Sequence, residues 1–281
     1  MITLHNCQKN YKDFSLDLSL EIPSGRVTGL IGRNGAGKST TIKAILGLIK
    51  PDGGEVRVLG KNPREFVASD KESLGVALSY SGLNEEFNVL SIIEILQKMY
   101  PQFNRASFLR FCELQQIPLK KPVRSFSTGM KAKLKVIIAI THNARLLVLD
   151  EPTAGLDVIA RSEIIDLQPY YLVEDEERSV LISSHISTDL EGFCDDVYLI
   201  DDGKLVLHEE TDTILHQYGV LKVSSEQYDR IEKEYLLASR KEAFGYICLT
   251  KEKQYFLENY PDIVVENGSL DSVIILMLGR E

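Results

Sequence analysis

The sequence predicts an α/β protein. It is expected to have a mixed sheet flanked by helices, an inserted helical subdomain, an antiparallel β subdomain and a small α+β C-terminal appendage. Three observations predict this class. Short apolar runs typical of buried strands recur, a glycine-rich loop joins one of them to a helical pattern, and residues 88–141 have no convincing strand. The 281 residues, 44% of them hydrophobic, supply a sizeable core.

The first core elements follow from side-chain periodicity. Five apolar residues alternate with polar ones and predict a half-buried strand: Phe14, Leu16, Leu18, Leu20 and Ile22. After a turn at Pro23–Gly25, the apolar run Val27–Ile31 predicts a central parallel strand. Beyond the glycine-rich loop, apolar residues at helical spacing predict a helix: Ile42, Ile45, Leu46 and Ile49.

Later apolar runs predict the remaining core strands. They are Glu55–Leu59, Leu74–Tyr80, Leu146–Leu149, Val180–Ser183 and Val197–Ile200. Residues 88–141 instead carry apolar side chains at helical spacing, interrupted by Pro101 and Pro118. We therefore predict a helical subdomain at about residues 85–141, inserted into a larger α/β domain of residues 1–215.

The C-terminal segment, residues 216–281, is rich in charged residues and has no phosphate-binding motif. Phe244–Leu249 predicts a strand, and Ser269–Leu278 predicts a capped helix. This segment is therefore expected to be a small folded domain and not a disordered tail. Its expected role is a homodimer contact or regulation.

Composition restricts the functional class. The formal net charge of −9 argues against a broad contact with phosphate backbones, so no nucleic-acid partner is expected. The basic residues that do cluster fit a solvated loop and helix face: Lys120, Lys121, Arg124, Lys131, Lys133 and Lys135.

Cysteine spacing and hydropathy indicate a cytosolic chain. The four cysteines lie far apart without a CxxC pair, as expected for reduced thiols and not for a metal cluster. The N-terminus lacks a basic-then-apolar leader. The longest apolar runs, Val136–Ile140 and Val273–Leu278, are far shorter than the roughly 18 residues that span a bilayer. Any membrane role is therefore expected to depend on a partner.

The first chemical motif is Gly32–Thr40, in which four residues separate Gly32 from Gly37-Lys38-Ser39. Its glycines permit close backbone approach, so that N–H groups can surround a polyphosphate at the start of the next helix. Lys38 is expected to neutralise the β- and γ-phosphates, and the Ser39 hydroxyl to hold Mg²⁺. The motif predicts a P-loop NTPase core whose binding residues are Gly32, Asn34, Gly35, Ala36, Gly37, Lys38, Ser39 and Thr40.

The second motif is the apolar strand Leu146–Leu149, followed by Asp150 and Glu151. Nucleotides bind at the carboxyl ends of strands in open α/β sheets, so Asp150 is expected to reach Mg²⁺ through a water ligand. Glu151 is suited to orient or deprotonate the attacking water.

Two further segments, SFSTGM at Ser125–Met130 and ISSH ending at His185, complete a resemblance to ATP-binding cassette ATPases, the nucleotide-binding subunits of ABC transporters. The resemblance covers roughly residues 1–215. It implies that ATP and Mg²⁺ are bound between two subunits arranged head to tail. It also implies that Ser127 and Gly129 contact the γ-phosphate held by the opposite subunit.

Three more residues match the family singly. Tyr11 stands where the family has an aromatic residue that stacks on adenine, and Asp157 where a loop couples the two composite sites. His185 corresponds to the histidine that hydrogen-bonds the γ-phosphate and orients the water. The resemblance thus implies that Lys38, Glu151 and His185 are the catalytic residues.

The sequence departs from the family pattern at two places. Ser79-Tyr80-Ser81 stands where the family normally has a glutamine that senses the γ-phosphate. A serine side chain is shorter than a glutamine side chain, so contact between Ser79 and Mg²⁺ would need a bridging water. The signature also has Thr128 and Met130 in place of the commonest glycine and glutamine.

The segments Met99–Phe103 and His185–Glu191 narrow the resemblance to bacterial drug or peptide exporters with separate ATPase and membrane chains. The expected partners are an integral membrane permease and a second copy of the chain or a paralogous ATPase. The expected location is cytoplasmic, on the inner face of the cell membrane. Two alternatives remain open at this stage, an ATP-gated regulatory cassette with little hydrolysis and a soluble cassette ATPase without a transport role.

Overall fold

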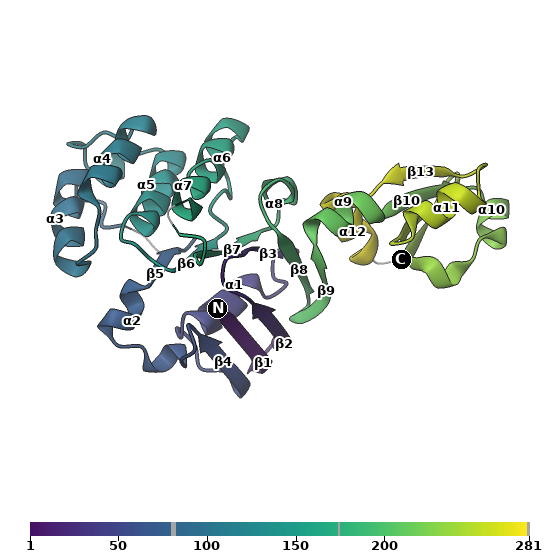
Figure 1. Ribbon diagram of the computed structural model, residues 1–281, viewed down its shortest axis with the longest axis horizontal. Coiled ribbons are helices and arrows are strands. Elements are labelled where there is room, and N and C mark those ends of the chain that lie inside the picture. Colours follow the sequence, from purple (N-terminus) through teal and green to yellow (C-terminus); the bar gives the residue numbers. More distant parts are fainter. Residues whose placement is uncertain (80–82, 174, 280–281) are drawn as a thin grey trace.

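The computed structural model describes residues 1–79, 83–173 and 175–279, and a six-stranded sheet forms its centre (Figure 1). The strands, in spatial order, are β5 (Leu74–Ala77), β6 (Leu146–Asp150), β7 (Ser179–Ser184), β3 (Val27–Ile31), β8 (Asp196–Asp201) and β9 (Lys204–Glu210). Neighbours are parallel except β9, which is antiparallel to β8. Ser183 pairs with Asp150, and Ser184 pairs with Ile31. The carboxyl ends of β6, β7 and β3 therefore meet at one edge.

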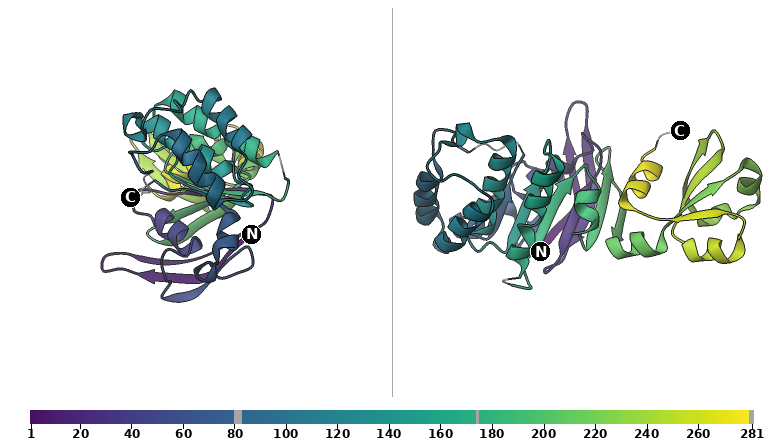
Figure 2. Two further views of the ribbon diagram at one scale, coloured as in Figure 1. Left: turned by 90° about the vertical axis from the view of Figure 1, so that its left-hand side faces the viewer. Right: turned by 90° about the horizontal axis from the view of Figure 1, so that it is seen from above.

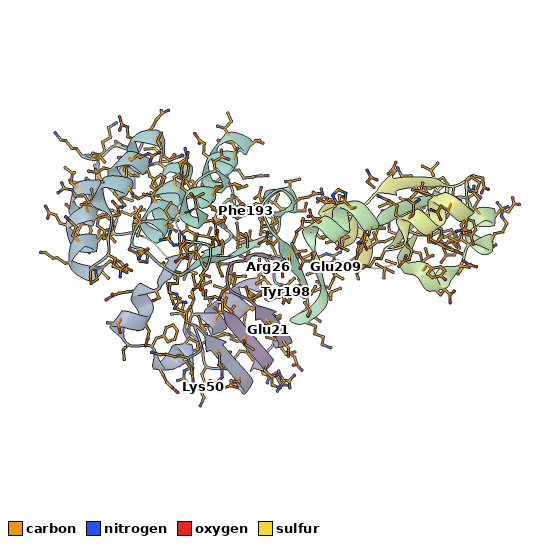
Figure 3. The ribbon with its side chains drawn as sticks, viewed as in Figure 1. Glu21, Arg26, Lys50, Phe193, Tyr198 and Glu209 are labelled. Carbon is orange, nitrogen blue, oxygen red and sulfur yellow. The ribbon has the colours of Figure 1, made fainter. Side chains whose placement is uncertain are left out.

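A three-stranded antiparallel sheet packs below this centre, in the order β2 (Ser15–Ile22), β1 (Ile2–Asn10), β4 (Gly53–Val58). Helix α1 (Lys38–Ile45) shares its apolar core with the lower face of the six-stranded sheet. The Tyr198 hydroxyl on β8 donates to the carbonyl oxygen of Glu21 on β2 at 2.6 Å and so joins the two sheets (Figure 3).

The other face of the six-stranded sheet is covered by helices, which gather at one end of the molecule in Figures 1 and 2. They are α3 (Val89–Met99), α4 (Arg105–Leu114), α5 (Thr128–Ile140), α6 (Val158–Ile165) and α7 (Gln168–Leu172). Along β6, Leu147 and Leu149 face this helical side, whereas Leu146 and Val148 face the three-stranded sheet. Strand β6 is thus apolar throughout because both of its faces are buried.

Several further elements are short, and the N-caps of α3 and α4 are asparagines. The short elements are α2 (Ala68–Glu72), α8 (Thr188–Glu191) and the 3₁₀ turns Pro63–Glu65, Val123–Ser125 and Lys233–Tyr235. Asn88 accepts a hydrogen bond from the Ser91 N–H at 2.9 Å, and Asn104 from the Ser107 N–H at 3.0 Å. Each asparagine satisfies an N–H group that the first turn of its helix leaves unpaired.

The C-terminal appendage projects from the β9 side of the molecule (Figure 2). Its antiparallel sheet has the order β11 (Leu236–Glu242), β12 (Gly245–Thr250), β10 (Gly219–Val223), β13 (Val264–Asn267). Its helices are α9 (Thr211–Gln217), α10 (Ser225–Arg230), α11 (Lys253–Asn259) and α12 (Leu270–Met277). Ile214, Tyr218 and Val273 belong to the apolar cluster that also fills the helical side of the six-stranded sheet. The appendage therefore packs directly onto the core.

The predicted α/β class is confirmed, with some elements differing in their bounds. Leu74–Tyr80 was predicted as a strand, but β5 ends at Ala77, and Tyr80 lies outside the described residues. The helix predicted to include Ile49 ends at Ile45, because Gly47 takes a left-handed φ of 67° and terminates it. Strand β1 was not predicted. Its register shifts between Leu4 and Cys7 and interrupts the period of two.

All four cysteines are buried and free. Burial raises the pKa of the Cys112 thiol to about 12. Within the described residues, none of the helices has the length and apolar character that a bilayer crossing requires.

Candidate functional site

The glycine-rich loop between β3 and α1 borders a hollow of about 200 Å³. Gly37 has a φ of 115°, and a Cβ atom there would lie 3.1 Å from Phe14. A Cβ atom on Gly32 would lie 2.2 Å from the carbonyl oxygen of Ile200, so a side chain does not fit there. Gly32 and Ala36 are buried behind the loop. The residues lining the hollow are Phe14, Arg33, Asn34, Gly35, Gly37, Lys38, Ser39, Thr40 and Glu151.

Lys38, the first residue of α1, directs its amine back across the loop. Its Nζ donates to the carbonyl oxygen of Gly32 at 2.7 Å and to that of Arg33 at 3.2 Å. The same nitrogen lies 3.1 Å from Oε1 of Glu151. The side chain is only 5% exposed, so its charge is balanced by oxygen atoms of the loop and by one carboxylate.

Asp150, at the end of β6, is 1% exposed and accepts hydrogen bonds from three serine hydroxyls. Ser39 and Ser183 donate to Oδ1, at 3.1 and 2.8 Å, and Ser79 donates to Oδ2 at 3.1 Å. These serines come from α1, β7 and the segment after β5. A buried carboxylate with hydroxyl neighbours is a set of hard oxygen donors, the type that Mg²⁺ prefers.

Glu151 lies between Lys38 and His185. Its Oε2 atom is 2.6 Å from Nδ1 of His185. An ionised carboxylate only accepts hydrogen bonds, so Nδ1 is the donor, and in a neutral ring Nε2 is then the acceptor. The Glu151 backbone has a φ of 50° and its N–H donates to the hydroxyl of Ser183 at 3.0 Å. A residue other than glycine held at positive φ is typical of functional sites.

The signature segment lies at the exposed start of α5. Ser127 is the N-cap of this helix and accepts a hydrogen bond from the Met130 N–H at 3.2 Å. Asp157 is the N-cap of α6 and accepts from the Ala160 N–H at 2.9 Å. A Cβ atom on Gly129 would lie 3.4 Å from that of Ala160, so the two helix starts are neighbours. Neither Ser127 nor Gly129 lines the hollow at Lys38.

Tyr11 lies in the connection between β1 and β2, and its side chain is 47% exposed. Its N–H donates to the carbonyl oxygen of Phe14 at 2.8 Å, and the two ring centroids are 6.3 Å apart. Phe14, not Tyr11, lines the hollow. An exposed ring beside the phosphate loop is suited to stacking on a planar base.

The structure thus brings together Lys38, Ser39, Asp150, Glu151 and His185, whereas Ser127, Gly129 and Asp157 do not line the hollow at Lys38. Sequence reasoning did not assign Ser183 or Phe14 to the site. Ser183 is the first serine of the ISSH segment, two residues before His185, and Phe14 follows Tyr11 by three positions, so both stood beside recognised positions. Ser79 was treated only as a departure from a family pattern, and Ser81 of that pattern lies outside the described residues.

A strand, a glycine-rich loop and a helix beside a strand-end Asp–Glu pair define a P-loop ATPase. Two further features narrow this class to the ATP-binding cassettes. One is the signature segment at the start of α5 in the inserted helical region, and the other is the histidine that follows strand β7.

Comparison with known proteins agrees. The family described as "ABC transporter" matches residues 16–154. The "Lantibiotic transport ATP-binding protein SrtF" of Streptococcus pyogenes is 32% identical over 216 residues, which cover 75% of this chain and 92% of the relative. The "Nod factor export ATP-binding protein I" of Cupriavidus pinatubonensis is 27% identical over 300 residues, covering 100% of this chain and 91% of that protein. The chain belongs to the ABC transporter family, as an ATP-binding subunit with ATPase activity.

Among solved structures, the chain is similar to the "Structure of ATP binding subunit of ABC transporter". The sequence identity is 25% and the TM-score is 0.67, and the match covers 77% of this chain and 92% of that one.

Proposed function

We propose that the chain is the ATP-hydrolysing subunit of an exporter and drives separate membrane subunits. Two relatives named for lantibiotic transport and for Nod factor export support this reading. The proposal depends on one observation: the side chains of Lys38, Asp150, Glu151 and His185 lie together at one edge of the sheet. In this proposal Lys38 binds the β- and γ-phosphates, Glu151 accepts the proton of the attacking water, and His185 holds Glu151 and the γ-phosphate in place.

The oxygen donors around Asp150 fit a magnesium ion. Ser39 and Asp150 would hold it together with phosphate oxygens and water, and Ser79 would orient the carboxylate. When bound, Mg²⁺ neutralises charge on the phosphates.

Replacement of Ser79 is expected to weaken the response to Mg²⁺. Ser79→Ala removes one of the three hydroxyl donors to Asp150, so the Mg²⁺ concentration for half-maximal turnover should rise about tenfold. Phosphate release titrated with Mg²⁺ measures this. Ser162→Ala is the matched control, because Ser162 donates to Asp166 at 3.5 Å on an exposed surface. Identical titrations for both variants would remove Ser79 from the metal site.

We also propose that two subunits close head to tail on two ATP molecules. The support is the position of Ser127 and Gly129, which do not line the hollow of their own chain. Helix α5 has 13 residues, and its start exposes N–H groups that favour an anion. In the proposed dimer this helix start completes the pocket of the other subunit, with Asp157 beside it. Closure is then a domain motion that the ligand stabilises.

The membrane partner is proposed to dock in an apolar groove between the core and the helices. The groove has a volume of about 410 Å³ and lies between the end of α1, strand β5 and helix α5. Leu48 lines it and is 57% exposed, and Tyr100, Ile138 and His142 form the opposite wall. An exposed leucine beside an apolar groove is typical of a surface that receives a helix of another chain.

Leu48→Glu is expected to abolish co-purification with an integral membrane chain from detergent-solubilised membranes, because it places a carboxylate where an apolar side chain of the partner is proposed to pack. The measurement is the stoichiometric recovery of a chain with several apolar spans. Leu257→Glu on α11 is the matched control, since Leu257 is 46% exposed but lies in the appendage. Recovery of that chain with Leu48→Glu, or its absence from the unmodified protein, would contradict the proposed docking.

Finally, we propose that the chain divides near residue 215 into a nucleotide-binding domain and a C-terminal regulatory or dimerisation domain. The support is the four-stranded sheet of residues 219–267, which is separate from the six-stranded one.

A further inference from the structure

Helix α12 of the appendage contacts two segments that adjoin the candidate ATP site. Its first turn lies against α8, the helix that follows His185. Its last residues lie against the glycine-rich loop, through Arg33. One helix from the end of the chain thus contacts both segments.

The contact at the start of α12 is polar and joins a buried hydroxyl group to an exposed carboxylate. Ser187, two residues after His185, is only 3% exposed, and its hydroxyl donates to Oδ1 of Asp271. The Leu270 backbone hydrogen-bonds the carboxyl group of Glu191 at the end of α8. Burial raises the pKa of this carboxyl group, whereas the Leu270 hydrogen bond acts in the opposite direction. The segment 187–191 is therefore attached to α12 at both of its ends.

Apolar packing supports the same contact. Leu190 of α8 is fully buried in one cluster with Leu270, Val273 and Leu276 of α12. A helix of four residues such as α8 has little stability of its own, so its position depends on what it packs against.

The contact at the other end involves Arg33 of the glycine-rich loop. Its guanidinium group donates to the carbonyl oxygen of Leu278, which caps the C-terminus of α12. A cation at a helix C-terminus is favoured by the helix dipole and by the unpaired carbonyl groups there. Arg33 also provides one of the carbonyl oxygens that accept from Lys38.

The base of the appendage is fixed to the six-stranded sheet. Glu209 of β9, labelled in Figure 3, accepts from Lys251 Nζ at 2.5 Å and from the Tyr218 hydroxyl at 3.2 Å. A displacement of the appendage would therefore also displace α12.

We propose that α12 positions the His185 segment and the glycine-rich loop for hydrolysis, and that Asp271 and Ser187 are positioning residues of the reaction. The inference depends on the proposed role of His185. By this arrangement the appendage regulates turnover within its own subunit, because movement of α12 shifts the histidine that holds Glu151.

Asp271→Ala is expected to lower kcat about fivefold, since it leaves the buried Ser187 hydroxyl without its acceptor. The affinity of the Asp271→Ala variant for a non-hydrolysable ATP analogue should stay within about twofold of that of the unmodified protein, because Lys38 and Tyr11 are untouched. Ser187→Ala should give the same loss, and the double variant no further loss. Asp271→Asn keeps an acceptor oxygen and should restore most of the rate.

Asp262→Ala is the matched control, because its carboxylate contacts Arg230 and Gln227, both inside the appendage. Steady-state phosphate release and thermal melting are measured on the full chain for every variant. Equal kcat for Asp271→Ala and Asp262→Ala overturns the inference, as do additive losses in the double variant. A His185→Ala variant with undiminished turnover would instead overturn the proposed function on which the inference depends.

Discussion

A Glu151→Gln variant is expected to lose ATP turnover by at least about 1000-fold while still binding ATP. Glutamine has nearly the shape of glutamate, so the backbone at φ 50° and its hydrogen bond to Ser183 can persist. The amide cannot accept a proton from water, so the step proposed for Glu151 is lost. Single-turnover phosphate release measures the loss.

The contacts of Glu151 also predict how this variant binds ATP. In the structure the Glu151 carboxylate holds Lys38 at 3.1 Å, and this ion pair competes with phosphate for the lysine. A neutral amide holds Lys38 less strongly, so ATP affinity should not fall. The ATP-bound dimer should then accumulate and be visible by sedimentation. Glu177→Gln is the control, since Glu177 is 76% exposed on the surface. Turnover of Glu151→Gln within tenfold of the unmodified protein would exclude Glu151 as the base.

Much of the candidate site was predictable because parallel strands place their carboxyl ends together. An apolar run typical of a strand precedes each of three site segments: the loop after Ile31, the acidic pair after Leu149 and the histidine after Ser184. Strand pairing then brings them to one edge, as the Ser183–Asp150 register shows.

Other features depend on contacts that sequence spacing does not reveal. Ser79 and Ser183 are 71 and 33 residues from the Asp150 carboxylate to which they donate, so spacing along the sequence does not reveal these hydrogen bonds. Strand β1 escaped prediction because Asn6, at φ 46°, forms a bulge that moves the buried residues out of strict alternation. The Ser187–Asp271 bond joins residues 84 positions apart.

Ser127→Arg is expected to abolish turnover, by at least about 1000-fold, although Ser127 does not line the hollow of its own chain. In the proposed dimer, Ser127 faces the γ-phosphate of the other subunit. A long side chain at this exposed helix start would keep the two subunits apart. The individual subunit should bind ATP as before, because Lys38 and Ser39 line a hollow to which Ser127 does not contribute.

The double variant Glu151→Gln with Ser127→Arg tests whether Ser127 acts within its own subunit or across the dimer interface. Titration calorimetry should find ATP binding within about threefold of that of Glu151→Gln alone, while sedimentation finds only monomers at concentrations at which Glu151→Gln is dimeric. Ser225→Arg, at the start of α10 in the appendage, is the control for adding an arginine at an exposed helix start. If the monomer loses ATP affinity when Ser127 is replaced, the signature acts within its own chain. A dimer that persists in the double variant would mean that the subunits do not meet at this surface. The proposed composite site requires both results together, because a helix start that contacts phosphate only across an interface must affect assembly without affecting the binding of ATP to one subunit.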